Sequence, residues 1–193
     1  MRRQYRAPRS GRNAPDRVPR RPDQPGPTAA RAAADPKTEG PRPSSDVAIH
    51  RAVLLARPDV GAVVHAHLPA SMALTLAGEV PDPASLPETA LLLPRLPFVP
   101  FGAPGSADLA ARIAAAFTDG EVPAGAVLLE RHGAVAVGAT TDGASGPRRG
   151  ARTPAILAAL SQAVDRIELV EVLCRTWRDA LLLRAARSAI GPG

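Results

Sequence analysis

The chain has 193 residues, the size of one ordinary globular domain, and a formal net charge of +6. The positive charge is concentrated in residues 1–43, which hold eleven Lys or Arg against four Asp or Glu, whereas the remaining residues hold thirteen against fourteen. The single cysteine, Cys174, excludes an internal disulfide, and no apolar run reaches the roughly 18 residues of a membrane-spanning helix.

Residues 1–43 are expected to be disordered. They contain nine prolines, one valine and no leucine or isoleucine, too little apolar surface to offset the entropy of ordering. The segment lacks the apolar core of a secretory signal, and with Tyr5 as its only aromatic residue it is not expected to bind nucleic acid. A cytoplasmic protein without membrane contact is therefore expected. The folded domain is expected over residues 44–190.

Helices and strands are expected to alternate in the folded part. Ser44 or Ser45 is expected to cap a first helix over about 46–57. The later elements are expected in the following order: a strand at 61–67, a helix at about 70–77 closed by Gly78, a helical turn at 88–93, a strand at 98–101, a helix at 107–118 capped by Ser106, strands at 125–130 and 134–137, a mobile loop at 139–153, and a helix at about 154–188. This order indicates an α/β layer architecture.

Three of the four histidines stand in or beside apolar strands. His65 and His67 are separated by one residue, so on a strand their rings project from the same face. Two imidazoles at that spacing can share a tetrahedral metal ion, and His132 is the candidate third ligand because Gly133 allows a tight turn beside it. The alternative is that these histidines are hydrogen-bonded core residues; for His50 a packing role is expected.

Five segments carry a resemblance to a known family. They are residues 43–50, 56–67, 87–93, 98–106 and 131–138. In their order, spacing and amino-acid sequence they resemble the signature segments of the class II aldolase/adducin family. That family includes fuculose-phosphate and rhamnulose-phosphate aldolases, ribulose-phosphate 4-epimerase, methylthioribulose-phosphate dehydratase and adducin heads.

The resemblance implies a fold, a site and an activity. The implied fold is a three-layer α/β/α domain with a central, mainly antiparallel sheet, assembled as a homotetramer. The implied roles are ligation of zinc or another divalent metal by His65, His67 and His132, acid/base chemistry by Asp46, and contact with the substrate phosphate by Ser44 and Ser45. The implied activity is that of a zinc-dependent aldehyde-lyase or epimerase that cleaves a phosphorylated sugar by a retro-aldol step. The alternatives are a dehydratase of the same family and a catalytically inactive, adducin-type binding module.

The sequence departs from the family pattern at both ends. Family members carry strands of the central sheet and two further phosphate loops before the Ser-Ser segment, and residues 1–43 contain no legible counterpart. The resemblance therefore implies a fold that is incomplete at its N-terminus, with an exposed sheet edge. Residues 143–162 depart from the family pattern as well. The family's tyrosine near the C-terminus has no counterpart here, because Tyr5 is the only tyrosine. The sequence does not indicate which sugar phosphate is used.

Overall fold

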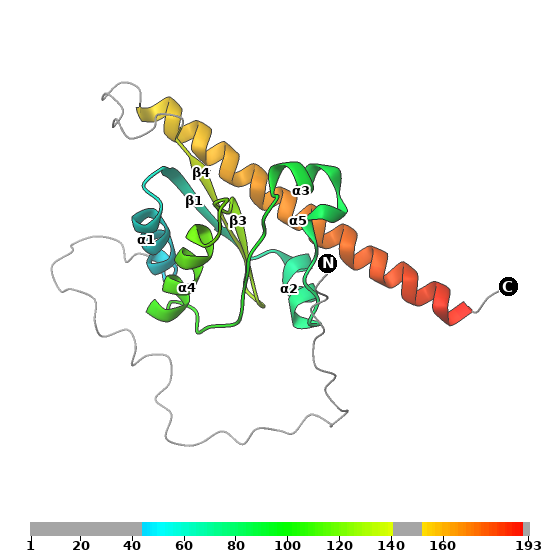
Figure 1. Cartoon of the computed structure of the whole chain (residues 1–193). Coiled ribbons are helices and arrows are strands. Elements are labelled where there is room, and N and C mark those ends of the chain that lie inside the picture. Colours follow the sequence, from blue (N-terminus) through cyan, green and yellow to red (C-terminus); the bar gives the residue numbers. More distant parts are fainter. Residues whose placement is uncertain (1–43, 141–151, 191–193) are drawn as a thin grey trace, which may run out of the picture. The chain divides into compact units, whose positions relative to one another are not determined.

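The computed structural model describes residues 44–140 and 152–190, so the expectations for residues 1–43 and 141–151 lie outside the described part. In the described domain a four-stranded sheet lies between two layers of helices, as expected (Figure 1). Its elements, in chain order, are α1 (Val47–Ala56), β1 (Val60–Ala66), α2 (Pro69–Leu76), η2 (Pro83–Ser85), α3 (Pro87–Leu92), β2 (Phe98–Val99), α4 (Ala107–Thr118), β3 (Ala126–Leu129), β4 (Gly133–Ala139) and α5 (Arg152–Ile190). None of the described helices is long and apolar enough to cross a membrane.

The sheet has the strand order β1-β4-β3-β2. Strand β4 pairs antiparallel with β1 on one side and with β3 on the other, whereas the short β2 pairs parallel with β3. The sheet is thus mainly antiparallel, as expected. Its two central strands, β3 and β4, are almost entirely buried, which agrees with their continuous apolar composition.

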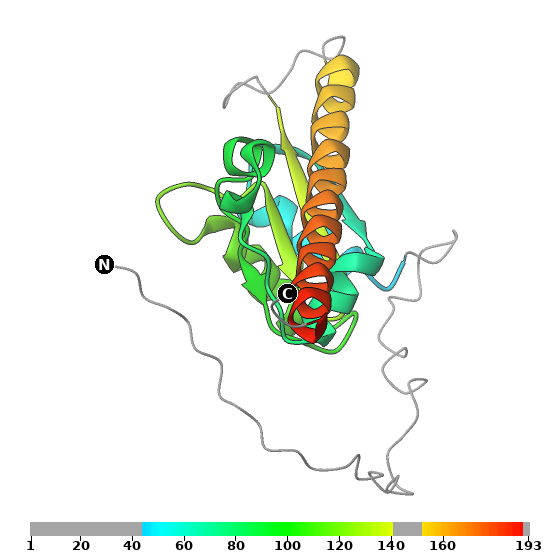
Figure 2. The ribbon, with the colours of Figure 1, turned by 90° about the vertical axis from the view of Figure 1, so that its right-hand side faces the viewer.

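Alternate residues of the central strands face the two helical layers. Val127 and Val135 belong to one core cluster with residues of α1 and α4, and Leu128 and Ala134 belong to the other with residues of α2 and α5. Helix α5 lies along the sheet face on the side opposite α1 and α4 (Figure 2). Gly138 permits this close packing, because a Cβ atom there would come within 2.8 Å of the Cα of Ala159.

Most sequence predictions of the elements are confirmed, and two are corrected. Ser106 caps α4, its hydroxyl accepting a hydrogen bond from the N–H of Leu109 at 3.2 Å, as predicted. The prediction that Ser44 or Ser45 caps the first helix is wrong, since Asp46 occupies the cap position. The strand predicted over 98–101 ends at Val99, because the next residue is a proline without an N–H to donate. The C-terminal helix runs unbroken for 39 residues.

Candidate metal centre

The end of β1 presents two histidine rings. His65 pairs with Val135 of β4, and His67 follows the last strand residue, two positions before α2 begins at Pro69. The two ring centroids lie 5.1 Å apart, and the rings meet nearly edge to face. The strand alternation seen in the sequence therefore does place both imidazoles side by side.

The third ring comes from the turn between β3 and β4. The N–H of His132 donates to the carbonyl of Leu129 at 3.3 Å, which closes the turn. Arg131 has a positive φ of 58°, an uncommon conformation for a residue with a side chain, and Gly133 has a φ of 100°. A Cβ atom on Gly133 would overlap the carbonyl oxygen of Ala66 and come within 2.9 Å of the Cα of His67. Glycine is thus what lets the two segments approach.

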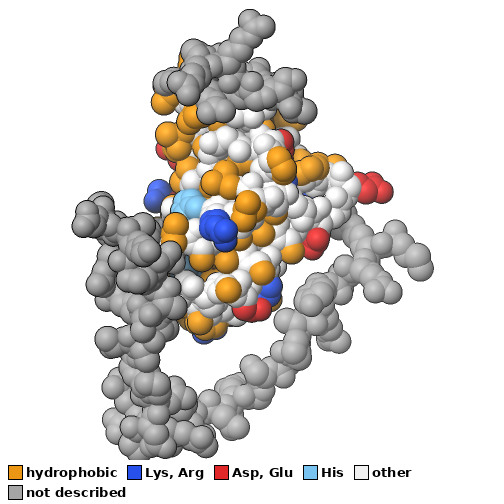
Figure 3. All heavy atoms as spheres, turned by 90° about the vertical axis from the view of Figure 1, so that its left-hand side faces the viewer, with side chains coloured by type: hydrophobic (Ala, Val, Ile, Leu, Met, Phe, Trp, Pro, Cys, Tyr) orange, Lys and Arg blue, Asp and Glu red, His pale blue; other side chains and the backbone are white. Residues whose placement is uncertain are grey.

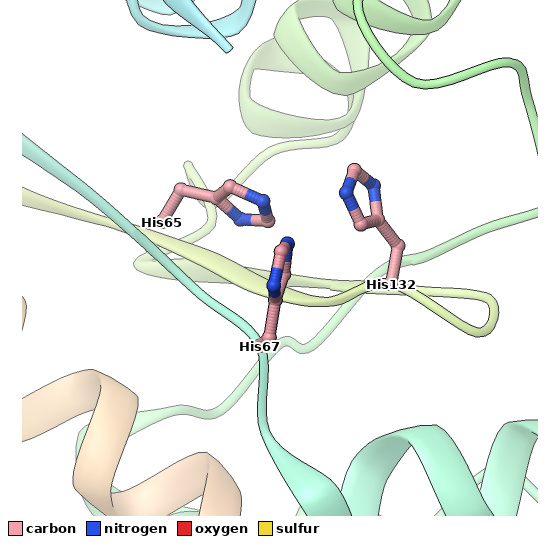
Figure 4. A group of neighbouring side chains, drawn as sticks. All are labelled: His65, His67 and His132. Carbon is pink, nitrogen blue, oxygen red and sulfur yellow. The ribbon is translucent and has the colours of Figure 1, made fainter. Parts of the chain in front are cut away.

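The three rings converge on one point (Figure 4). His132 lies 4.9 Å from His65 and 5.0 Å from His67, centroid to centroid. One nitrogen of each ring lies within 4.8 Å of the other two. A tetrahedral ion with Zn–N bonds near 2.0–2.1 Å needs nitrogens about 3.4 Å apart, so nitrogens at the 4.8 Å limit must approach by about 1.4 Å on binding. This arrangement could hold a divalent metal ion.

The surroundings of the rings favour the neutral, ligand form of histidine. Nδ1 of His65 lies 3.0 Å from the carbonyl oxygen of Ala134, and a proton on Nδ1 leaves the lone pair of Nε2 free. Within the described residues, Nε2 of His65 and Nδ1 of His132 are buried without a hydrogen-bond partner. Burial lowers the pKa of both His65 and His132, and neighbouring imidazoles lower it further. The donor set therefore fits a metal ion, for which neutral imidazole is the ligand form.

Asp46 lies near this cluster at the start of α1. Its side chain makes no capping hydrogen bond with the helix. Its charge raises the pKa of His65 and of His132, which opposes the effect of burial on both groups. Within the described residues the carboxylate is thus not used to cap the helix, and its charge acts on two of the three rings.

Ser44 and Ser45 precede this carboxylate and are exposed. The hydroxyl oxygen of Ser44 accepts a hydrogen bond from the N–H of Asp46 at 3.2 Å. A Cβ atom on Gly105, in the loop before α4, would lie 3.3 Å from the carbonyl oxygen of Ser45. Both hydroxyls therefore stand beside the start of a helix, where backbone N–H groups can also face an anion. On the face drawn in Figure 3 a histidine side chain reaches the surface among basic side chains, which in the described part are all arginine.

Sequence reasoning missed the residues that surround the turn at His132. The N–H of Arg131 donates to the hydroxyl of Thr75 at 2.9 Å, and its guanidinium lies 4.4 Å from the ring centre of Phe101. The carboxylate of Glu130 accepts from the N–H of Phe101 at 2.8 Å. These contacts join residues far apart in the chain, so no local pattern signals them. His50 lies on α1, half-buried, and is not part of the cluster.

Comparison with known proteins identifies the family of this chain. The family model for the class II aldolase and adducin N-terminal domain matches residues 25–146, a span that begins before the boundary expected at residue 44. A 3-oxo-tetronate 4-phosphate decarboxylase of Cupriavidus necator is 38% identical over 102 residues, which are 50% of this chain and 44% of the relative. The similarity to this relative therefore extends over less than half of its length.

Solved structures share the fold. YgbL of Escherichia coli, a proposed aldolase/epimerase/decarboxylase, is 25% identical with a TM-score of 0.51, covering 71% of this chain and 57% of YgbL. The L-fuculose-1-phosphate aldolase of Thermus thermophilus is 24% identical with a TM-score of 0.53, covering 80% of this chain and 70% of the aldolase, a likeness of fold alone. The chain spans about half the length of the decarboxylase and of YgbL.

Proposed function

The chain belongs to the class II aldolase and adducin family, and we propose that it is a metal-dependent lyase that breaks a carbon–carbon bond in a small phosphorylated sugar or sugar acid. One observation carries the proposal. His65, His67 and His132 bring three ring nitrogens within 4.8 Å of one another, and two ring nitrogens of this cluster are buried without a partner in the described part of the chain. A protein that used these rings only for packing would gain nothing from such unpaired groups, whose burial costs free energy.

Zinc is the metal that three imidazoles and one open position suit best, although another divalent ion is compatible with them. When bound, such an ion supplies a Lewis acid for a substrate carbonyl oxygen. The chain's own residues set its place: the carbonyl of Ala134 orients His65, and the glycine at 133 lets the turn of His132 reach the pair. The retained three-ring set favours an enzyme over a catalytically inactive, adducin-type module.

Asp46 is the residue proposed to accept and return the proton of the reaction. Its carboxylate is not used to cap α1, and it lies close enough to the cluster to affect the pKa of two rings. A carboxylate in that place can take a proton from a substrate hydroxyl as the carbon–carbon bond breaks. Ser44 and Ser45 are proposed to donate hydrogen bonds to the substrate phosphate at the start of α1, where the helix dipole also favours an anion.

Two reactions are the leading candidates. The resemblance to aldolases and epimerases favours retro-aldol cleavage of a ketose phosphate, with release of an aldehyde. The 38% identity to a relative named 3-oxo-tetronate 4-phosphate decarboxylase favours loss of carbon dioxide from a phosphorylated oxo acid. Both reactions leave an electron pair on the carbon next to a carbonyl group, so one site could serve either. A dehydratase is a third possibility within the same family.

We also propose the extent and assembly of the working protein. Residues 44–190 are inferred to form the family domain, and this domain is inferred to assemble as a homo-oligomer, with a tetramer expected. Exposed apolar side chains along α5, among them Leu157, Leu160 and Val164, support an assembly that covers them. The lone buried thiol of Cys174 suits the reducing cytoplasm expected from the sequence.

The experiment that tests this function measures zinc content and turnover in the same preparations. Unmodified protein is compared with His65→Ala and with His50→Ala, a control that removes a histidine outside the cluster. The substrates are ketose 1-phosphates, a pentulose 5-phosphate and 3-oxo-tetronate 4-phosphate. We expect about one zinc per chain and turnover of one substrate, both lost in His65→Ala and kept in His50→Ala. Zinc-loaded protein that turns over none of them would contradict the proposed activity.

A further inference from the structure

The turn that carries His132 is held at both of its ends. At one end, Gly133 lies against the backbone of Ala66 and His67, with no room for a side chain. At the other end, the N–H of Arg131 donates to the hydroxyl of Thr75 at 2.9 Å. His132 stands between these two contacts. Both contacts are made by the continuous segment from β1 to α2, which also carries the other two histidines.

The hydroxyl of Thr75 is fixed before it meets the turn. The side chain is 4% exposed and lies in the last turn of α2. Its hydroxyl donates to the carbonyl of Ser71 at 2.9 Å, with the carbonyl of Met72 at 3.3 Å as a second acceptor. A threonine hydroxyl has one hydrogen to donate, so its remaining lone pairs are free to accept from Arg131. The helix thus holds an acceptor at a set position for the backbone of the turn.

The backbone that this acceptor holds is strained. Arg131 has a φ of 58°, in the left-handed region that a residue with a Cβ atom seldom adopts. Such conformations persist only where the surroundings stabilise them, and they gather at functional sites. Without the hydroxyl, the Arg131 N–H loses this partner, and one of the contacts that hold the residue in this region is removed. The next residue along the chain is His132, so a shift of the Arg131 backbone would move its ring relative to those of His65 and His67, beside which it lies (Figure 4).

We propose that Thr75 is a positioning residue of the metal centre: through its hydrogen bond to the N–H of Arg131 it holds His132 beside His65 and His67, so that the three rings can close on one metal ion. This inference rests on the proposed metal site and extends it to a residue that touches neither metal nor substrate. The helix α2 therefore connects the segment of His67, which it follows, to the turn of His132, which it contacts near its C-terminal end.

The test measures zinc affinity by competition with a chromophoric chelator, on full-length protein that is folded by circular dichroism. Thr75→Val keeps the shape of the side chain and removes the hydroxyl; Thr75→Ala is measured beside it because alanine fits wherever threonine does. Thr75→Ser restores the hydroxyl. The matched control is Thr89→Val, which removes a fully buried hydroxyl. That hydroxyl donates to the carbonyl of Pro83, with the carbonyl of Leu86 at 3.1 Å as a second acceptor, and it has no link to the turn.

Outer contacts of metal sites typically change affinity about 10–100-fold, and we expect that loss in Thr75→Val and Thr75→Ala. Thr75→Ser should bind zinc within about threefold of the unmodified protein, and Thr89→Val should bind it unchanged even if it unfolds more easily. Equal affinity in Thr75→Val and Thr89→Val, or a failure of serine to restore binding, would overturn the role of Thr75 and leave the site standing. Absence of zinc binding by the unmodified protein would overturn both the site and this role.

Discussion

Substitution of Gly133 by alanine tests how closely the two histidine-bearing segments must approach. Alanine at a φ of 100° carries a backbone strain of about 1–2 kcal/mol. Its Cβ atom would also overlap the carbonyl oxygen of Ala66 and lie 2.9 Å from the Cα of His67, so one segment must shift, at a further cost of about 1–3 kcal/mol. Gly133→Ala should therefore lower the free energy of unfolding by about 2–5 kcal/mol and weaken zinc binding at the same time.

The matched control is Gly78→Ala, at the end of α2. Gly78 also has a positive φ, 79°, but a Cβ atom there meets nothing within 4 Å. This variant should therefore show only the backbone term, about 1–2 kcal/mol, with zinc affinity unchanged. Both variants would be unfolded with urea and followed by circular dichroism. If Gly133→Ala were as stable as Gly78→Ala and bound zinc with the same affinity, the close contact between the start of β4 and the end of β1 would not be needed for stability or for metal binding.

Four further outcomes are expected. Burial lowers the pKa of His65 and His132, so the unfolded chain takes up protons at a higher pH than the folded one. In the metal-free protein the free energy of unfolding should therefore fall as pH drops below about 6.5. Urea titrations at several pH values should show a smaller fall when both residues are replaced by Gln. Burial, with a smaller effect from the charge of Glu171, raises the pKa of Cys174 to about 12, so thiol reagents at pH 8 should react only as the protein unfolds, and rapid reaction of native protein would contradict this. Asp46→Asn should keep zinc and lose about 10²–10⁴-fold in turnover, and unchanged turnover would remove Asp46 from the reaction. Sedimentation should show an oligomer at micromolar concentration, and a clean monomer would refute the assembly.

The sequence predicted the histidine pair because its geometry is local. Alternation along a strand requires only that the chain around residues 65–67 be extended, and the three valines of the preceding segment favour this conformation. His132 was a weaker prediction, since no local sequence pattern indicates that β4 pairs with β1. The useful signals were the glycine that follows it and the family resemblance of residues 131–138, and the structure explains the glycine by its contact with Ala66 and His67.

Other features depend on contacts that sequence patterns do not encode. Thr75 and Arg131 are 56 residues apart, and a threonine in an apolar helix gives no sign that its hydroxyl has a distant partner. The start of α1 was misplaced because serine and aspartate are both good capping residues, and Ser-Ser-Asp offers three candidates in a row. The end of β2 at Val99 depended on a proline, which a pattern of apolar residues does not weigh.

The central claim is that three histidines of this chain bind one metal ion, and X-ray absorption at the zinc edge tests it most directly. The protein would be loaded with one equivalent of zinc and the spectrum fitted for the number and type of ligands. We predict three imidazole nitrogens at about 2.0–2.1 Å, completed by an oxygen ligand and without sulfur. A spectrum with fewer than three imidazoles, or one that matches zinc in buffer, would contradict the site formed by His65, His67 and His132.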